Sequence, residues 1–283
     1  MRCSPANYGE LKSDGTLSTT VTDSNNNDTV HVFSTYANAA AGSVSGATAC
    51  QGLVETSTRA YQGTGTSRTL RTQTDVNYVA AKMSSAETTG ASDLQPIVDN
   101  IFATSVTTTN GPTNKVMKVV RTPDTGFGNG GPTFGETVVE KIYDWGRGAP
   151  GALLKETDTN YVWQSDGRYT FAGLVDLVAS ETIKDGSGNQ VAETTHSYDN
   201  GANLYPSNIT VQHVAAPNVV RGNRSSISRW LNNRSAPLVV PVDIYDTGMP
   251  YDSVQPGNTS AAYRTNFMYN STGTYVIETV HGY

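Results

Sequence analysis

Hydrophobic and polar residues alternate with a period of two along much of this chain. Between residues 68 and 78, Leu70, Thr72, Thr74, Val76 and Tyr78 fall on one face of an extended segment and polar residues on the other. This alternation predicts a half-buried β-strand. The same criterion, with bounding Gly, Asn or Pro residues, predicts further strands over residues 29–36, 53–61, 101–109, 115–121, 136–143, 152–163, 174–183, 190–198, 208–214, 225–231, 238–245, 261–269 and 274–280.

Helical periodicity is confined to residues 92–102, and Pro96 limits any helix there to a turn or two. The run Asp185-Gly-Ser-Gly-Asn189 between two alternating segments indicates a tight hairpin, because glycine adopts the positive φ angles that such turns require. We therefore predict an all-β fold of stacked antiparallel hairpins, either a β-solenoid or an elongated sandwich-like repeat array, with almost no helix.

The chain also repeats itself. The run Leu70-Arg-Thr-Gln-Thr-Asp-Val-Asn-Tyr-Val79 returns 83 positions later as Leu153-Leu-Lys-Glu-Thr-Asp-Thr-Asn-Tyr-Val162, and a looser copy follows around residues 186–199. Repeated strand–turn–strand units usually stack because one unit cannot bury its apolar face alone. The expected repeat-structural residues are the turn glycines and strand tyrosines of the copies: Gly63, Gly65, Tyr78, Gly146, Gly148, Tyr161, Gly186, Gly188 and Tyr198.

Composition narrows the functional classes. The net charge of −6 and the pI near 5.2 argue against nucleic acid or an anionic membrane as a partner, because both are bound by clustered Lys and Arg. No segment is long and apolar enough for a membrane span. Cys3 and Cys50 lack metal-ligand spacing and are either one disulfide or two buried thiols. Sequons make Asn27, Asn208, Asn223, Asn233, Asn258 and Asn270 possible glycosylation sites.

Tyr-Asp pairs close several of the predicted strands, at Tyr143-Asp144, Tyr198-Asp199-Asn-Gly201 and Tyr245-Asp246-Thr-Gly248, and Tyr269-Asn270-Ser-Thr-Gly273 has Asn in place of Asp. With the Gly-rich hairpin at residues 184–199, these motifs resemble the RHS or tyrosine-aspartate (YD) repeat proteins of bacteria, in degenerate form. The resemblance is strongest over residues 52–283, and it implies a secreted or cell-surface chain of stacked β-hairpins. We expect residues 1–51 to form an N-terminal β arm or cap.

Motifs that could carry chemistry are weak. Gly126-Phe-Gly-Asn-Gly-Gly131 matches a dinucleotide fingerprint, but a strand rather than a helix is predicted after it, which favours a hairpin turn. Asp23-Ser-Asn-Asn-Asn-Asp28 alternates oxygen ligands, and a polar turn is favoured over a calcium loop. Glu136 and Glu140 share a strand face, which leaves a glycosidase-type carboxylate pair open. The four histidines lie on different predicted strands, so we expect no catalytic, cofactor-binding or metal site.

The sequence thus predicts a non-catalytic extracellular structural protein, a β-repeat building block of a surface fibre or of a larger RHS-like shell. Its partners would be further copies joined end to end or further repeats of a longer chain, because open strand edges are adhesive unless capped or charged. The alternative is an adhesin or carbohydrate-binding module that contacts surface polysaccharide through exposed aromatic rings, those of Trp145, Trp163 and Trp230 and of the 15 tyrosines.

Overall fold

The predicted all-β fold is confirmed by a computed structural model, which describes residues 16–35, 53–80, 101–124, 134–201, 204–207, 220–232, 236–254, 264–273 and 275–281. The largest sheet comprises β1 Thr16–Thr22, β2 Asp28–Thr35, β3 Leu53–Gln62, β4 Thr69–Ala80, β5 Ile101–Asn110, β6 Lys115–Pro123, β7 Thr137–Arg147, β8 Leu153–Tyr161, β9 Val178–Asp185, β10 Gln190–Tyr198, β12 Arg224–Arg229 and β13 Leu238–Pro241. Two small sheets contain β11 Leu204–Tyr205 with β14 Ile244–Tyr245, and β15 Asp252–Val254 with β16 Arg264–Tyr269 and β17 Val276–His281.

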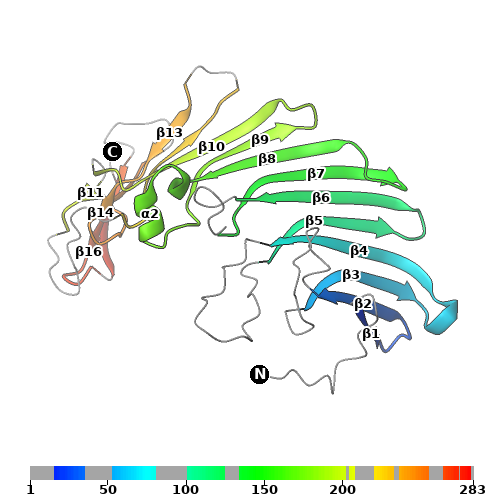
Figure 1. Cartoon of the computed structure of the whole chain (residues 1–283). Coiled ribbons are helices and arrows are strands. Elements are labelled where there is room, and N and C mark those ends of the chain that lie inside the picture. The colour runs from blue at the N-terminus through cyan, green and yellow to red at the C-terminus, as the bar shows by residue number, and fades with distance from the viewer. Residues whose placement is uncertain are drawn as a thin grey trace, which may run out of the picture. The chain divides into compact units, whose positions relative to one another are not determined.

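Strands of the largest sheet pair in chain order, omitting only β11, so each hairpin is laid beside the one before it (Figure 1). In this sheet the neighbouring strands from β1 to β7 pair antiparallel, as do β9 with β10, β10 with β12 and β12 with β13, whereas β11 and β14 pair in parallel. Short connections are what antiparallel neighbours permit. The stacked-hairpin prediction therefore describes the observed strand order.

Contacts divide the chain into two compact units, residues 1–156 with 185–187 and residues 157–184 with 188–283. The first unit contains β1 to β7, and the second contains β10 to β17 together with the helical segments η2 Val162–Gln164 and α2 Gly167–Phe171. The predicted boundary between residues 51 and 52 stays a prediction. No helix of the described residues is long and apolar enough to cross a membrane.

Few apolar side chains are buried in the described part of the chain. They are Leu17, Val30, Val116, Trp163, Tyr169, Val220, Ile244 and Val254. An almost equal set of polar side chains is buried, among them Asp124, Asp243 and Asp252. The strand at residues 68–78 is half-buried as predicted, and Gln73 and Asp75 on its polar face are as half-buried as Thr74 and Val76 on the other. Backbone ladders and side-chain hydrogen bonds must therefore stabilise much of this fold.

Threonine residues lie opposite one another on neighbouring strands, at positions where apolar core residues would be expected. Thr74 of β4 lies opposite Thr58 of β3 on one side and Thr108 of β5 on the other. Directly opposite side chains on one face interact, and β-branched pairs fit the pleated surface well. The high Thr content of the strands therefore stabilises a sheet whose two faces are both partly open to solvent.

The structure reveals a larger repeat than the sequence analysis predicts. In the first copy, β3 and β4 are followed by β5 and β6, and in the second copy β7 and β8 are followed by β9 and β10. A Cβ atom added to Gly111, in the β5–β6 turn, would overlap the carbonyl oxygen of Leu70, and one added to Gly186, in the β9–β10 turn, would overlap that of Leu153. Leu70 and Leu153 are matching residues of the sequence repeat, so the repeating unit has four strands.

Most of the predicted strands are confirmed, with exceptions. The segment 238–245 divides into β13 and β14, the strand expected from residue 174 begins at Val178, and β1, β11 and β15 were not predicted. The strand predicted from residue 101 is confirmed as β5, and residues 92–100, where a helical turn or two was allowed, lie outside the described part. The strand expected at residues 208–214 also lies outside it. The α-helix that is described, α2, has five residues and no amphipathic repeat that could have predicted it.

Candidate functional site

The predicted repeat glycines lie in or beside the connections between strands, with Gly146 near the end of β7. Gly63, Gly65, Gly148 and Gly188 have positive φ angles, and a Cβ atom at Gly146 would overlap the carbonyl oxygen of Ala149. Gly186 has the close approach described above. These positions therefore require glycine for backbone reasons, although their residues do not converge on one site.

Two of the predicted strand tyrosines, Tyr78 and Tyr198, form hydrogen bonds to a neighbouring strand. The hydroxyl of Tyr78 donates to the carbonyl oxygen of Glu55 at 2.7 Å, and that of Tyr198 donates to the carbonyl oxygen of Val178 at 3.0 Å. Burial raises the pKa of both phenols. Tyr161, the counterpart of Tyr78 in the second copy, is the last residue of β8. Tyr78 and Tyr198 therefore join neighbouring strands through hydroxyl groups that keep a proton to donate.

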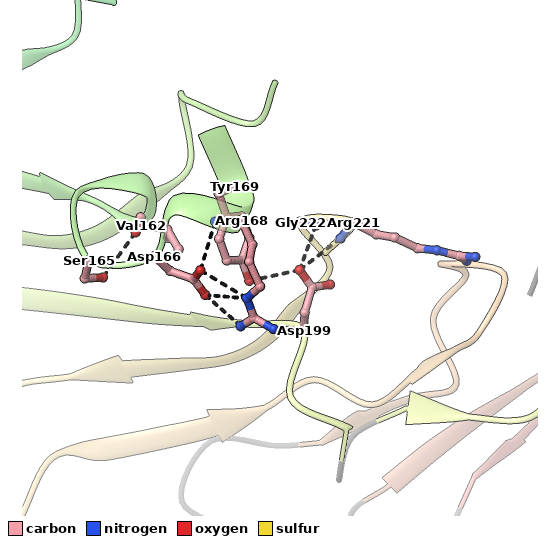
Figure 2. Close-up of polar contacts among 8 residues, drawn as sticks. All are labelled: Val162, Ser165, Asp166, Arg168, Tyr169, Asp199, Arg221 and Gly222. Atoms are coloured by element: carbon pink, nitrogen blue, oxygen red, sulfur yellow. Dashed lines mark hydrogen bonds and ion pairs between the residues drawn. The ribbon is translucent and has the colours of Figure 1, made fainter. Parts of the chain in front are cut away.

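Asp199, which ends a Tyr-Asp pair, makes the densest set of polar contacts in the second unit (Figure 2). Its carboxylate accepts hydrogen bonds from the backbone N–H groups of Arg221 at 3.0 Å, Gly222 at 2.9 Å and Asn223 at 3.0 Å. Its own N–H donates to the carbonyl oxygen of Asn223 at 2.7 Å. Asp199 has a φ of 51°, a left-handed conformation that Asp and Asn tolerate better than most residues. The carboxylate thus holds the chain just before β12.

Helix α2 supplies a further hydrogen-bond donor to the Asp199 carboxylate. Tyr169 is 3% exposed, and its hydroxyl donates to Asp199 Oδ2 at 2.9 Å, as Figure 2 shows. Burial, and then the neighbouring Asp199, raise the pKa of Tyr169 far above its usual value. Asp166 caps the helix by accepting the Arg168 N–H at 3.0 Å and also pairs with the Arg168 guanidinium. With four donors directed at Asp199, the arrangement binds backbone and leaves little acceptor capacity for a ligand.

Asp124 is the counterpart of Asp199 in the first copy, 75 positions earlier, as Gly111 is of Gly186. It is 1% exposed, its carboxylate accepts the Phe134 N–H at 3.1 Å, and its own N–H donates to the carbonyl oxygen of Glu136 at 2.8 Å. In both copies an aspartate after the fourth strand therefore anchors the segment that enters the next strand. We call Asp124 and Asp199 the aspartate clamps.

A second polar cluster lies between β14 and β16. Arg264 Nη1 contacts Asp243 Oδ2 at 2.8 Å and also pairs with Asp252, whose side chain is fully buried. Burial, and further the nearby Asp243 carboxylate, raise the pKa of Asp252 despite the Arg264 guanidinium. Two buried acids thus share one arginine, an arrangement that is sensitive to proton uptake.

Next to this cluster, four tyrosines pack ring against ring. Tyr205 stacks on Tyr251 with centroids 4.0 Å apart, and Tyr245 meets Tyr251 at 5.1 Å and Tyr269 at 5.8 Å, edge to face in both cases. Beside Tyr245 and Tyr269 lies a cavity of about 340 Å³, here called the tyrosine pocket. Its lining is Ser207, Tyr245, Thr247, Met268, Tyr269, Asn270 and Ser271.

The edge of the three-stranded sheet is formed by β17, next to β16. Every residue of β17 is exposed, including Val276 at 48%, Ile277 at 67% and Val280 at 42%. A single acidic residue, Glu278, interrupts the run. This is an apolar, weakly charged edge of the kind that pairs readily with another strand.

Of the histidine and glutamate candidates, His31 and Glu140 lie in the described part of the chain and each pairs with an oppositely charged neighbour. His31 Nδ1 lies 2.7 Å from Glu55 Oε1, which also accepts from the Thr58 hydroxyl, and these bonds lower the pKa of Glu55, with Thr58 the larger cause. Glu140 pairs with Arg121 at 2.8 Å. None of these residues except Arg121 lines either of the two described cavities, and Arg121 lines a smaller one beside Phe102.

The remaining predicted sites divide between described and undescribed residues. The Asp23 carboxylate accepts the Asn25 and Asn27 N–H groups, which forms the polar turn predicted for residues 23–28. No group of three possible metal ligands occurs among the described residues. Trp163 is 4% exposed and Trp145 is 42% exposed. Cys3, Cys50, residues 126–131, Asn208, Asn233 and Asn258 lie outside the described residues.

The three described sequon asparagines are all engaged by the fold. Asn27 Oδ1 accepts the Gly63 N–H at 3.1 Å, the Asn223 N–H donates to Asp199, and Asn270 Oδ1 accepts the Tyr275 N–H at 3.1 Å. Asn270 Nδ2 donates to the hydroxyl of Thr272 within its own sequon at 2.9 Å. Their glycosylation stays a prediction.

Sequence reasoning did not single out the aspartate clamps or the tyrosine pocket, although the Tyr-Asp and Tyr-Asn pairs at 198, 245 and 269 contribute to both. The signal was present in these motifs, but their partners lie 22 to 24 residues away in the case of Asp199. Comparison with known families and with curated proteins finds no match to this chain.

Proposed function

We propose that this chain is a non-catalytic structural protein of the cell surface or extracellular space, a β-repeat building block that joins to other copies through its strand edges. The observation that carries the proposal is β17, a fully exposed edge strand with Val276, Ile277 and Val280 open to solvent. The proposed location rests on the resemblance to RHS and YD repeat proteins.

The organisation of the polar residues supports a structural role. The aspartate clamps accept backbone N–H groups, and Tyr78 and Tyr198 donate to backbone carbonyls. Groups of this kind could serve catalysis if they faced a cleft, but here they fasten strands and turns of a repeating unit. Such repeats extend by adding copies, because each unit contacts mainly its neighbours.

The edges of the sheets supply the attachment points. Natural edge strands usually carry Lys, Pro or inward-pointing charges that block pairing with another chain. β17 carries one acidic residue, and β1, the edge of the largest sheet, has the sequence Thr-Leu-Ser-Thr-Thr-Val-Thr without any charge or proline. A strand added to either edge would complete the backbone ladder and cover apolar side chains such as Ile277 or Val21, which is 56% exposed.

The test is sedimentation velocity of the purified chain over a range of concentrations, with a matched pair of variants. Ile277→Lys places a charge on the edge strand, and Leu154→Lys places one at a 51%-exposed position of β8, an inner strand whose neighbours are β7 and β9. The wild type and Leu154→Lys should self-associate, and Ile277→Lys should associate at least tenfold more weakly, about 1.4 kcal/mol. A wild type that stays monomeric at all concentrations would refute the proposal.

Of the three tryptophans named for the alternative role as a carbohydrate-binding module, Trp163 is excluded, whereas Trp145 is exposed and Trp230 is half-buried. Trp163 is buried and cannot stack on a sugar, whereas the ring of Trp145 is accessible. Loss of binding on a glycan array in Trp145→Ala would support this alternative.

A further inference from the structure

The tyrosine pocket lies between two strand-end motifs of one unit. Tyr245 ends β14 and Thr247 follows it in the turn, while Met268 and Tyr269 end β16 and Asn270 begins the turn toward β17. The carbonyl oxygen of Phe267 accepts from the Tyr245 hydroxyl at 3.4 Å, which joins the two strand ends. The volume of the tyrosine pocket, about 340 Å³, falls at the lower end of the range for small-molecule sites.

The aromatic wall of the pocket is fixed in place by its neighbours. Tyr245 is held edge to face against both Tyr251 and Tyr269, and Tyr251 is itself stacked on Tyr205. Two rings that are already ordered lose little side-chain freedom when a ligand packs on them. Met268 is 47% exposed and adds an adaptable apolar rim.

The rest of the lining is polar but carries no full charge. Thr247, Ser207 and Ser271 contribute hydroxyl groups, and Asn270 contributes an amide whose Oδ1 accepts the Tyr275 N–H at 3.1 Å. Among the described residues that line the cavity there is no Asp, Glu, Lys, Arg or His. A hydroxyl group can both donate and accept, and it rotates to suit its partner. The site is therefore built to meet neutral groups that also donate and accept hydrogen bonds.

This combination selects among ligand classes. A charged ligand would lose its hydration without meeting an opposite charge, and a purely aliphatic ligand would cover hydroxyl groups without satisfying them, which costs about 1–3 kcal/mol for each. A sugar ring has an apolar C–H face for the tyrosines and hydroxyl groups for the polar wall. We propose that the tyrosine pocket binds a single neutral sugar ring, as part of a surface polysaccharide or as a free glycoside.

The site is distinct from the tryptophan faces considered above, and it does not depend on self-association. Its test is saturation-transfer NMR and calorimetric titration of the whole chain with the methyl glycosides of glucose, galactose and N-acetylglucosamine, with glucuronic acid as the charged comparison. A polymer built of the best-binding sugar, compared with its methyl glycoside, then distinguishes a polysaccharide ligand from a free one.

Three variants locate the binding. Tyr269→Ala, checked for folding by circular dichroism, should weaken binding of a neutral glycoside at least tenfold, and Thr247→Val, which keeps the side-chain shape, should weaken it about fivefold. Tyr275→Ala removes a 71%-exposed tyrosine that does not line the pocket and should leave binding unchanged. The proposal is overturned if no neutral glycoside binds, if glucuronic acid binds as well as glucose, or if folded Tyr269→Ala and Thr247→Val both bind like the wild type.

Discussion

The aspartate clamp at Asp199 should contribute several kcal/mol to the stability of the second unit. Its carboxylate accepts three backbone N–H groups and the Tyr169 hydroxyl. Hydrogen bonds to a charged group contribute about 1.5–3 kcal/mol each, so four would sum to about 6 kcal/mol or more if they were additive. Asp199 is only half-buried, so water can replace some of them. We therefore expect Asp199→Ala to lower the free energy of unfolding by about 3–4 kcal/mol.

Two further substitutions separate the contributions to the loss of unfolding free energy expected for Asp199→Ala. Asp199→Asn keeps one carbonyl oxygen and suits the positive φ angle, so it should cost about 1–2 kcal/mol, and Tyr169→Phe, which removes one donor, should cost about 1 kcal/mol. Asp144→Ala is the matched control, because Asp144 also ends a Tyr-Asp pair but is exposed and accepts a single N–H, from Trp145.

Urea unfolding is monitored through buried Trp163, which belongs to the same unit as Asp199, and by circular dichroism of the whole chain, which also follows the unit of Asp144. The differences are measured as shifts of the midpoint at constant slope. Asp144→Ala should cost less than about 1 kcal/mol. If Asp199→Ala unfolds at the same midpoint as Asp144→Ala, the clamp does not hold the segment before β12 and the reasoning fails.

The same structure makes two other predictions. Gly111→Ala should destabilise the chain by about 1–3 kcal/mol, because the added methyl group overlaps the Leu70 carbonyl oxygen. The control Gly201→Ala places a methyl group that meets nothing within 4 Å and should change stability by less than about 1 kcal/mol. Equal midpoints of the two variants in chemical denaturation would contradict the close approach of Gly111 to Leu70. The raised pKa of Asp252 means that the folded state holds its proton more tightly, so this group's stabilisation is full below the unfolded pKa of 3.8 and is lost as pH rises through the folded value. Asp252→Asn should therefore remove a fall in stability that begins as pH rises above 3.8, measured by thermal unfolding across a pH series, and an unchanged profile would show that Asp252 is not the titrating group.

Strand positions could be predicted from the sequence where alternation was bounded by turn residues. β6 and β10 are examples, each beginning after a Gly-containing turn. β1 has only Leu17 and Val21 among five Ser and Thr residues, too weak a pattern to predict a strand, and its pairing with β2 supplies the missing stabilisation. Helix α2 is too short for periodicity and is held by Tyr169 and its Asp166 cap. Both elements depend on tertiary partners, which local patterns do not encode.

The candidate sites depended even more on long-range contacts. The Tyr-Asp pairs could be recognised, and aspartate was expected to bond backbone near it in sequence. Asp144 does so with Trp145, but Asp199 bonds residues 221–223 across a connection whose path no local pattern predicts. The tyrosine pocket likewise combines residues near 207, 247 and 269. The strand β17 is the exception, since the alternation over residues 274–280 predicted it, and its pairing with another copy stays a prediction.

Cryo-electron microscopy of the purified chain across a concentration series tests the central proposal most directly, because assembly through strand edges is what a structural building block of this type must do. We expect ordered assemblies at high concentration in which the backbone of β17 pairs with a strand of another copy. Dispersed single particles at every concentration, with β17 still unpaired, would contradict the account.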